Sequence, residues 1–162
     1  MRQFATVVCI VTILSLITAC SIFRPANQSQ PPMTTAAALW QYITTEDLYT
    51  EWEPFGDTEG LLKGAPPHGP KIKIYPNRLA NESVYTAKEN SIIVMENYDK
   101  NGTTLLTINL MQKRSGYAPS AGNWFWASYE PDGTVIEEGR IKSCVECHVS
   151  MAFDDYTFIH QW

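Results

Sequence analysis

The chain has 162 residues, of which 44% are hydrophobic, 12% aromatic and 18% charged. This length corresponds to one ordinary domain with its terminal segments, and it excludes a multidomain enzyme. The composition supplies enough apolar side chains for a packed core and excludes a disordered or collagen-like chain. The 12 Lys and Arg residues against 17 Asp and Glu residues give a net charge of −5. Nucleic acid is therefore excluded as an expected partner, because phosphate binding requires a basic surface.

The first residues have the form of an export signal. Arg2 supplies a positive charge, residues 4–18 are uncharged and mainly apolar, and small residues precede Cys20. The apolar stretch is too short and wrongly flanked for a membrane-spanning helix. The sequence LITAC at 16–20 resembles the bacterial lipobox, so we predict a lipoprotein signal peptide at residues 1–19 and a lipidated N-terminus at Cys20. The alternative is a non-lipidated signal that contains a chance cysteine.

Lipidation at Cys20 predicts an exported protein that is anchored to a membrane and faces the periplasm. Each buried methylene of an acyl chain adds about 0.8 kcal/mol to membrane binding. Ser21 follows the cysteine, where an aspartate would favour retention in the inner membrane. In a Gram-negative host we therefore expect the outer membrane.

Two segments follow the predicted signal. Residues 20–38 are rich in Gln, Ser, Pro and Thr, which is typical of a flexible tether, and we expect it to become helical near its end. The folded domain is predicted at residues 39–162. Apolar residues at its start follow an interrupted helical stripe: Leu39, Trp40, Ile43, Leu48 and Trp52. Prolines and glycines between residues 54 and 70 then predict a long loop, and long loops in compact domains are often functional.

Beyond the loop the hydrophobic period changes to two. Lys71-Ile72-Lys73-Ile74-Tyr75 alternates strictly, and four further runs are apolar or rich in β-forming residues. The predicted strands are 71–75, 91–98, 103–112, 124–129 and 134–141. Asn-Gly at 101–102 and Pro-Asp-Gly at 131–133 predict hairpins between successive strands. We therefore expect an α+β fold with an antiparallel sheet of about five strands, helices before it and a short helix after it.

Cys144-Val145-Glu146-Cys147-His148 is the most informative motif of the chain. Two cysteines three residues apart lie on one helical face, so both thiols can bond to the vinyl groups of one haem while the next imidazole reaches the iron. Cys9 leaves with the signal and Cys20 takes lipid, so neither remains to pair with these two. A disulfide would leave His148 unexplained, and a zinc site would require a further ligand such as His68 or His160. The motif predicts one covalent haem c per chain, with His148 as the proximal iron ligand.

An electron-transfer cytochrome normally has a second strong axial ligand, commonly Met or His. Met151 follows His148 on the same short helix, and Met95 and Met111 lie in strand patterns. The remaining ligand candidates are His68 in the Pro-His-Gly loop and His160 near the C-terminus. A hydrogen bond that stabilises the backbone is a more ordinary role for a loop histidine such as His68 than a bond to iron. Because no ligand stands out, the sequence favours a five-coordinate iron with an open distal site.

The order of motifs along residues 38–162 resembles the cytochrome P-460 and cytochrome c′-beta family. The haem motif alone is shared by many proteins, but a His-Gly loop, a Trp-Phe-Trp strand and a C-terminal haem motif on a β-rich chain form a specific combination. Four-helix cytochromes c′ also place the motif late, but the period-two segments argue against them. The motifs are LWQYI at 39–43, APPHG at 65–69, IYPN at 74–77, SIIV at 91–94, GNWFWA at 122–127, Gly139 and CVECH at 144–148.

The resemblance implies an antiparallel β fold that covers one face of a c-type haem, usually in homodimers. It also implies one of two functions. In cytochrome P-460 proper, a lysine amine is bonded to the porphyrin edge and the enzyme oxidises hydroxylamine. In cytochrome c′-beta that bond is absent, and the open iron binds nitric oxide or carbon monoxide beneath an apolar aromatic cap.

The residues that would distinguish these branches lie on two predicted strands. Lys71 and Lys73 follow the His-Gly loop, where a cross-linking lysine is expected, although both could be solvent-facing lysines on an amphipathic strand. Family members often carry a lysine before Glu-Asn-Tyr, and this chain has Met95 there, which weakens a close transfer of the family's properties to this chain. Glu96 could be a distal proton acceptor for amine oxidation or a surface carboxylate.

We predict that His68, Phe125 and Trp126 contribute to the distal pocket, where an apolar wall would favour neutral diatomic ligands. Packing in the core is the alternative for the two aromatic residues. The sequence thus predicts a haem protein that binds nitric oxide or a related small nitrogen ligand. A hydroxylamine-oxidising enzyme and an electron carrier with a redox partner protein remain alternatives.

Overall fold

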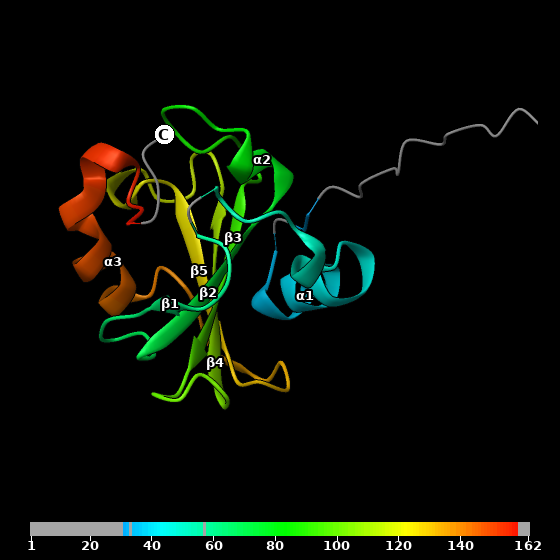
Figure 1. Cartoon of the computed structure of the whole chain (residues 1–162). Coiled ribbons are helices and arrows are strands. Elements are labelled where there is room, and N and C mark those ends of the chain that lie inside the picture. Colours follow the sequence, from blue (N-terminus) through cyan, green and yellow to red (C-terminus); the bar gives the residue numbers. More distant parts are fainter. Residues whose placement is uncertain (1–30, 33, 57, 159–162) are drawn as a thin grey trace, which may run out of the picture.

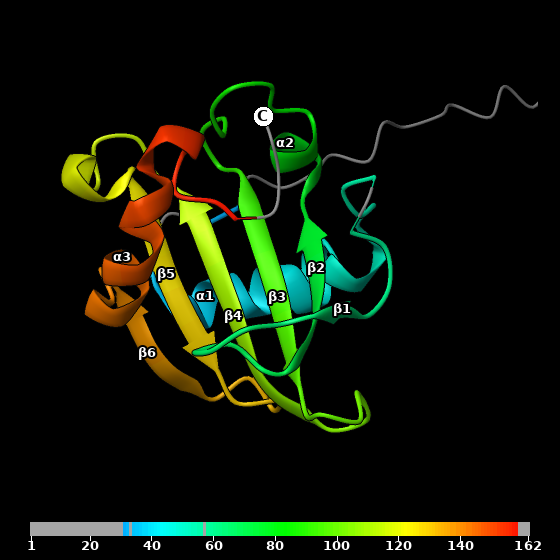
Figure 2. The same ribbon diagram turned by 60° about the vertical axis from the view of Figure 1, so that its left-hand side comes forward.

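A computed structural model describes residues 31–32, 34–56 and 58–158 of the chain. Its centre is an antiparallel sheet in which six strands neighbour one another in chain order. Helix α1 (Ala36–Gln41) lies on one face of this sheet and α3 (Lys142–His148) on the other, while the short α2 (Arg78–Asn81) follows β2 (Figures 1 and 2). The strands are β1 (Leu62–Lys63), β2 (Lys71–Pro76), β3 (Ile92–Tyr98), β4 (Leu105–Lys113), β5 (Trp124–Tyr129) and β6 (Val135–Gly139).

The predicted α+β class with an antiparallel sheet is confirmed. All five predicted strands are present, and their ends shift by at most two residues. The sixth strand, β1, lies inside the segment predicted as a loop. It has two residues and pairs with β2 through Leu62 and Ile72. Two residues are too few to show an alternation of apolar and polar side chains, so the sequence cannot predict this strand and only its pairing with β2 identifies it.

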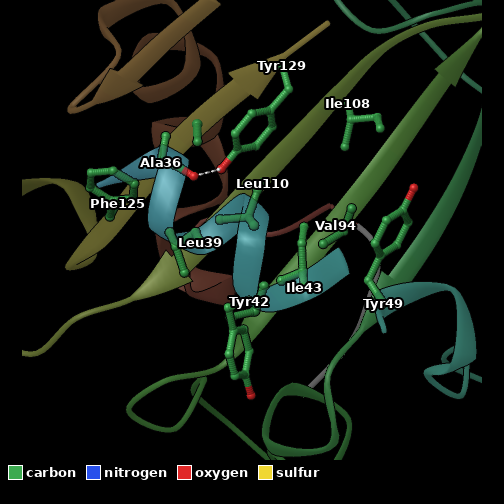
Figure 3. Packing of buried hydrophobic residues seen from close by; sticks show 12 residues of the cluster. Ala36, Leu39, Tyr42, Ile43, Tyr49, Val94, Ile108, Leu110, Phe125 and Tyr129 are labelled. Atoms are coloured by element: carbon green, nitrogen blue, oxygen red, sulfur yellow. Dashed lines mark hydrogen bonds between the residues drawn. The ribbon is translucent and has the colours of Figure 1, made fainter. Parts of the chain in front are cut away.

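The α1 face of the sheet holds the first part of the core. Because side chains alternate along a strand, Val94 and Leu110 point to this face and pack with Leu39 of α1 (Figure 3). The Tyr129 hydroxyl donates a hydrogen bond to the carbonyl oxygen of Ala36 at 2.9 Å. Full burial of one such aliphatic side chain contributes about 1.5–3 kcal/mol, so these contacts dock the helix firmly on the sheet.

The packed part of the chain begins before the predicted boundary at residue 39. Thr35 caps α1 by accepting a hydrogen bond from the Ala38 N–H, and Ala36 is fully buried. The Ala36 N–H donates to the Glu138 carboxylate at 2.6 Å. The three alanines at 36–38 resemble linker composition, but Ala36 is buried and bonded to Glu138 of β6.

The predicted signal peptide at 1–19, the lipidation site Cys20 and the tether as far as residue 30 lie outside the described residues. Within the described ranges, no helix is long and apolar enough to cross a membrane.

Candidate functional site

The face of the sheet that carries α3 is hollowed. A cavity of about 420 Å³ lies between this face, the segment before β2 and α3, and a narrow recess shares several of its walls and reaches Trp126. This volume falls in the range of about 300–1,000 Å³ that is usual for small-molecule and cofactor sites. Strands β2, β3 and β4 contribute apolar side chains to the wall of the cavity: Ile72, Ile74, Ile93, Met95 and Met111.

The cysteine motif forms α3 and borders this cavity. Cys144 and Cys147 are three residues apart on the helix, and neighbours at that spacing share one helical face. Cys144 is half-buried against the apolar cluster, Cys147 is exposed, and both thiols are free. Burial raises the pKa of the Cys144 thiol. In the described residues the two cysteines form no disulfide, and no group of three or more metal-ligating side chains is present.

His148, the last residue of α3, is 8% exposed and lines the cavity. Its Nδ1 lies 2.6 Å from the carbonyl oxygen of Tyr156. A carbonyl only accepts, so Nδ1 carries the proton and Nε2 keeps its lone pair, as a metal-ligating histidine requires. Burial lowers the pKa of His148, which also favours the neutral ring. The rings of Trp126 and Phe158 pack edge-on against it at 4.6 and 5.0 Å.

The segment after α3 is anchored to the sheet next to this histidine. The carboxylate of Asp155 pairs with Lys113 of β4 and accepts a hydrogen bond from the Ala87 N–H. The indole N–H of Trp124 donates to the Asp155 carbonyl at 2.8 Å. These contacts hold the chain where the carbonyl of the next residue, Tyr156, meets His148.

His68 lies across the cavity from His148. Their ring centroids are 6.4 Å apart and the rings are perpendicular, at 87°. The Nδ1 of His68 bonds to the side-chain oxygen of Asn109 at 3.2 Å. His68 therefore has a hydrogen bond, as is usual for a loop histidine. The partner is a side chain on β4, and it holds the ring at the cavity.

The structure places the predicted catalytic residues on the other face of the sheet. The Glu96 carboxylate accepts hydrogen bonds from the hydroxyls of Tyr49, Tyr75 and Tyr98 at 2.8, 3.0 and 2.7 Å. The Lys73 ammonium group lies 5.7 Å from the centre of the Tyr98 ring. Strand alternation puts Lys71 on the same side. Lys71, Lys73 and Glu96 therefore do not lie at the cavity. The alternative of two lysines that point away from Ile72 and Ile74 agrees with the structure, whereas Glu96 is buried and is not a surface carboxylate. Ile72 and Ile74 supply the cavity face of β2.

The predicted aromatic pair divides between the two faces. Trp126 lines the recess beside His148, whereas Phe125 packs in the α1 core, with the Arg114 guanidinium 3.5 Å from its ring centre. The placement of Phe125 in the distal pocket is therefore wrong, because adjacent strand residues point to opposite sides.

Other cavity features had no clear signal in the sequence. Asn97 and Asn109 occupy cavity-facing positions of β3 and β4, and the Asn97 amide donates to the Asn109 oxygen at 2.6 Å. The only sequence signal for these two asparagines was that they are polar residues at strand positions where the alternation predicts buried apolar side chains. Lys63 of β1 belongs to the cavity lining as well. The indole N–H of Trp126 is buried and has no hydrogen-bond partner within residues 31–32, 34–56 and 58–158.

A comparison with models of known protein families matches the part of the chain that forms this site. The family model described as Cytochrome P460 matches residues 49–159, which include β1 to β6, α3 and every residue of the cavity wall. No curated protein matches the chain.

Proposed function

This chain belongs to the cytochrome P460 family, and from that premise we propose that it is a c-type monohaem protein that binds nitric oxide or a related small nitrogen ligand. Family membership implies haem, and three features of the cavity fit one. The thiols of Cys144 and Cys147 are free, His148 keeps Nε2 available, and the unpartnered indole N–H of Trp126 offers a donor to a bound acceptor. The haem, when bound, supplies an iron that takes small ligands.

Each residue of the site has a role in this proposal. Cys144 and Cys147 would hold the group covalently, and His148 would be its iron ligand, with the Tyr156 carbonyl fixing the tautomer of the ring. The apolar side chains of Ile93, Met95 and Met111 exclude water and disfavour charged ligands, because a charge in such a wall would lose its hydration.

One observation favours ligand binding over hydroxylamine oxidation. The position before Glu-Asn-Tyr, where family members often carry a lysine, is Met95, and its side chain lines the cavity. Lys71 and Lys73 belong to the opposite face and cannot replace that lysine. A second candidate function, hydroxylamine oxidation, has one supporting feature, since Lys63 borders the wider part of the cavity.

We also propose that the protein is exported and anchored through lipid on Cys20, facing the periplasm, with the outer membrane favoured in a Gram-negative host. The signal form of residues 1–19 and the cysteine at 20 support this. A homodimer, as is usual in the family, and a redox partner protein belong to the same proposal.

The test uses purified, haem-loaded protein. We expect mass spectrometry to find haem bonded only to the peptide with Cys144 and Cys147, and the optical spectrum of the reduced protein to change when nitric oxide is added. Cys144→Ser with Cys147→Ser should abolish covalent haem. A third attached peptide with a strongly red-shifted reduced Soret band would overturn the proposal in favour of the enzyme. Lys63→Ala, with Lys71→Ala as the matched control, would then identify the bonded lysine.

A further inference from the structure

We propose that His68 is the sixth ligand of the haem iron in the resting protein, so that a small ligand must displace it. The inference rests on the proposed haem at Cys144, Cys147 and His148. It replaces the sequence-based expectation of a permanently open distal site. Three observations support it: the spacing of two rings, the tautomer of His68 and the docking of its loop.

The spacing of the two imidazoles is that of a shared metal atom. Two imidazoles on opposite sides of one metal, each bonded to it at about 2 Å, would place their ring centroids roughly 6 to 6.5 Å apart. The His68 and His148 centroids are 6.4 Å apart. If a small ligand lay between the iron and His68, the two ring centroids would have to be farther apart than this. The perpendicular ring planes, at 87°, are compatible with two axial ligands, which can rotate independently about their metal bonds.

The hydrogen bonds of His68 leave the correct nitrogen available. The Asn109 oxygen accepts a hydrogen bond from the Asn97 amide at 2.6 Å, so this atom is an acceptor. The Asn109 amide donates to the Ser128 hydroxyl at 3.0 Å, which agrees with the same orientation. The Nδ1 of His68, 3.2 Å from that oxygen, must therefore carry the proton. Its Nε2 keeps a lone pair and has no hydrogen-bond partner among the described residues. Ligating histidines typically donate their other ring N–H in this way.

The loop that carries His68 is docked against β3. A Cβ on Gly69 would lie 2.6 Å from the carbonyl oxygen and 2.8 Å from the nitrogen of Tyr98, so only glycine permits this approach. The Gly69 N–H also donates to the Asn97 oxygen at 3.4 Å. Asn97 thus contacts both the loop and Asn109, and it acts as a positioning residue for His68.

The first experiment compares the optical and electron paramagnetic resonance spectra of haem-loaded wild-type protein and His68→Ala. We expect a low-spin, six-coordinate ferric haem in the wild type and a high-spin haem in the variant. Added imidazole should restore the low-spin spectrum of His68→Ala, because it fills the position that the side chain left. Met95→Leu and Met111→Leu are the matched controls, since both methionines line the cavity, and both should stay low-spin.

The second experiment measures carbon monoxide association with the reduced protein. The apparent affinity for carbon monoxide is the intrinsic affinity multiplied by the fraction of protein whose iron is free of His68. We therefore expect His68→Ala to have an apparent affinity for carbon monoxide at least about tenfold higher than that of the wild type. The Asn109→Leu variant should lie between wild type and His68→Ala, because it loosens His68 without removing it.

Several outcomes would overturn the inference. A high-spin wild-type spectrum, or a low-spin His68→Ala spectrum without imidazole, would show that His68 is not the ligand. Loss of the low-spin state in Met95→Leu or Met111→Leu would assign a methionine instead. Covalent haem content, measured on the same samples, separates this result from failure of the proposed function. Protein without covalent haem contradicts the haem proposal itself, whereas normal haem content with the wrong spin state contradicts only the role of His68.

Discussion

The ring Nδ1 of His148 donates a hydrogen bond of 2.6 Å to the main-chain carbonyl of Tyr156. The bond joins the end of the cysteine motif to a residue eight positions later in the chain. Tyr156 has a left-handed backbone conformation, with φ of 66°, and its position depends on the anchoring of Asp155 to the sheet. The orientation of the proximal ligand is therefore set by a segment outside the haem motif.

Asp155→Ala should lower the free energy of unfolding by about 3–5 kcal/mol, because breaking a buried ion pair leaves one charge unpaired. The carboxylate and its partner Lys113 are 7% and 13% exposed. Urea unfolding of the purified protein measures the change. The matched control is Glu82→Gln, which removes exposed pairs with Arg78 and Lys88 and should leave stability close to that of the wild type. Equal effects of the two variants would contradict the anchoring role of Asp155.

Tyr49→Phe should destabilise the protein by roughly 1.5–3 kcal/mol, the usual contribution of a hydrogen bond to a charged group. The Tyr49 hydroxyl donates to the buried Glu96 carboxylate, and the Phe side chain would leave that acceptor with one donor fewer. Thermal or denaturant unfolding gives the difference. Tyr85→Phe is the control, because Tyr85 is 81% exposed. Wild-type stability in Tyr49→Phe would show that the carboxylate finds another donor.

The tyrosines around Glu96 predict a loss of stability at alkaline pH. Burial and the nearby carboxylate raise the pKa of Tyr98 to about 12 and raise the pKa values of Tyr49 and Tyr75 further. A tyrosine whose pKa is higher in the folded than in the unfolded protein stabilises the fold fully at pH values below its unfolded-state pKa of about 10. This stabilisation is lost as the pH rises through the folded-state pKa.

Unfolding free energies measured between pH 8 and pH 12 should therefore fall most steeply above pH 10 or so. Tyr98→Phe removes one of the titrating hydroxyls, so its curve should fall less steeply than the wild-type curve over that range. Parallel curves would mean that this tyrosine does not couple to folding.

Gly69→Ala should cost about 1–3 kcal/mol, the usual penalty of overpacking. The new Cβ would press on the Tyr98 backbone, and β3 cannot yield without breaking its pairing. The loop would move instead, so the haem-loaded variant should also lose part of its low-spin spectrum. Gly56→Ala is the control because an added Cβ meets nothing within 4 Å there. If Gly69→Ala is destabilised but its spectrum is unchanged, the docking of the loop does not determine the position of His68.

Local patterns were sufficient for the elements of this protein. Alternation in residues 71–75 and the apolar runs after it predicted every strand except the two-residue β1. The Cys-x-x-Cys-His spacing predicted α3 and the roles of its three side chains, because helical geometry alone brings them to one face. Neither result depends on contacts between distant segments.

The distribution of residues between the two faces of the sheet could not be predicted in the same way. β3 is apolar on both faces, so its period does not indicate which side takes α1 and which takes α3. The sequence grouped Lys71, Lys73 and Tyr75 on one side of their strand, but it left open whether that side faces the cavity. Only the docking of the two helices decided that this face belongs to the α1 side.

The sequence by itself thus determined the class of fold, the family and the three residues that would hold haem. These depend on periodicity and on spacing within a few residues. The tertiary structure alone decided that His68 faces His148 and that Glu96 meets three tyrosines on the opposite face. Both arrangements depend on contacts between distant parts of the chain, His68 with His148 and Glu96 with Tyr49 and Tyr75. Only the pairing register of the strands and the packing of side chains between them determine such contacts.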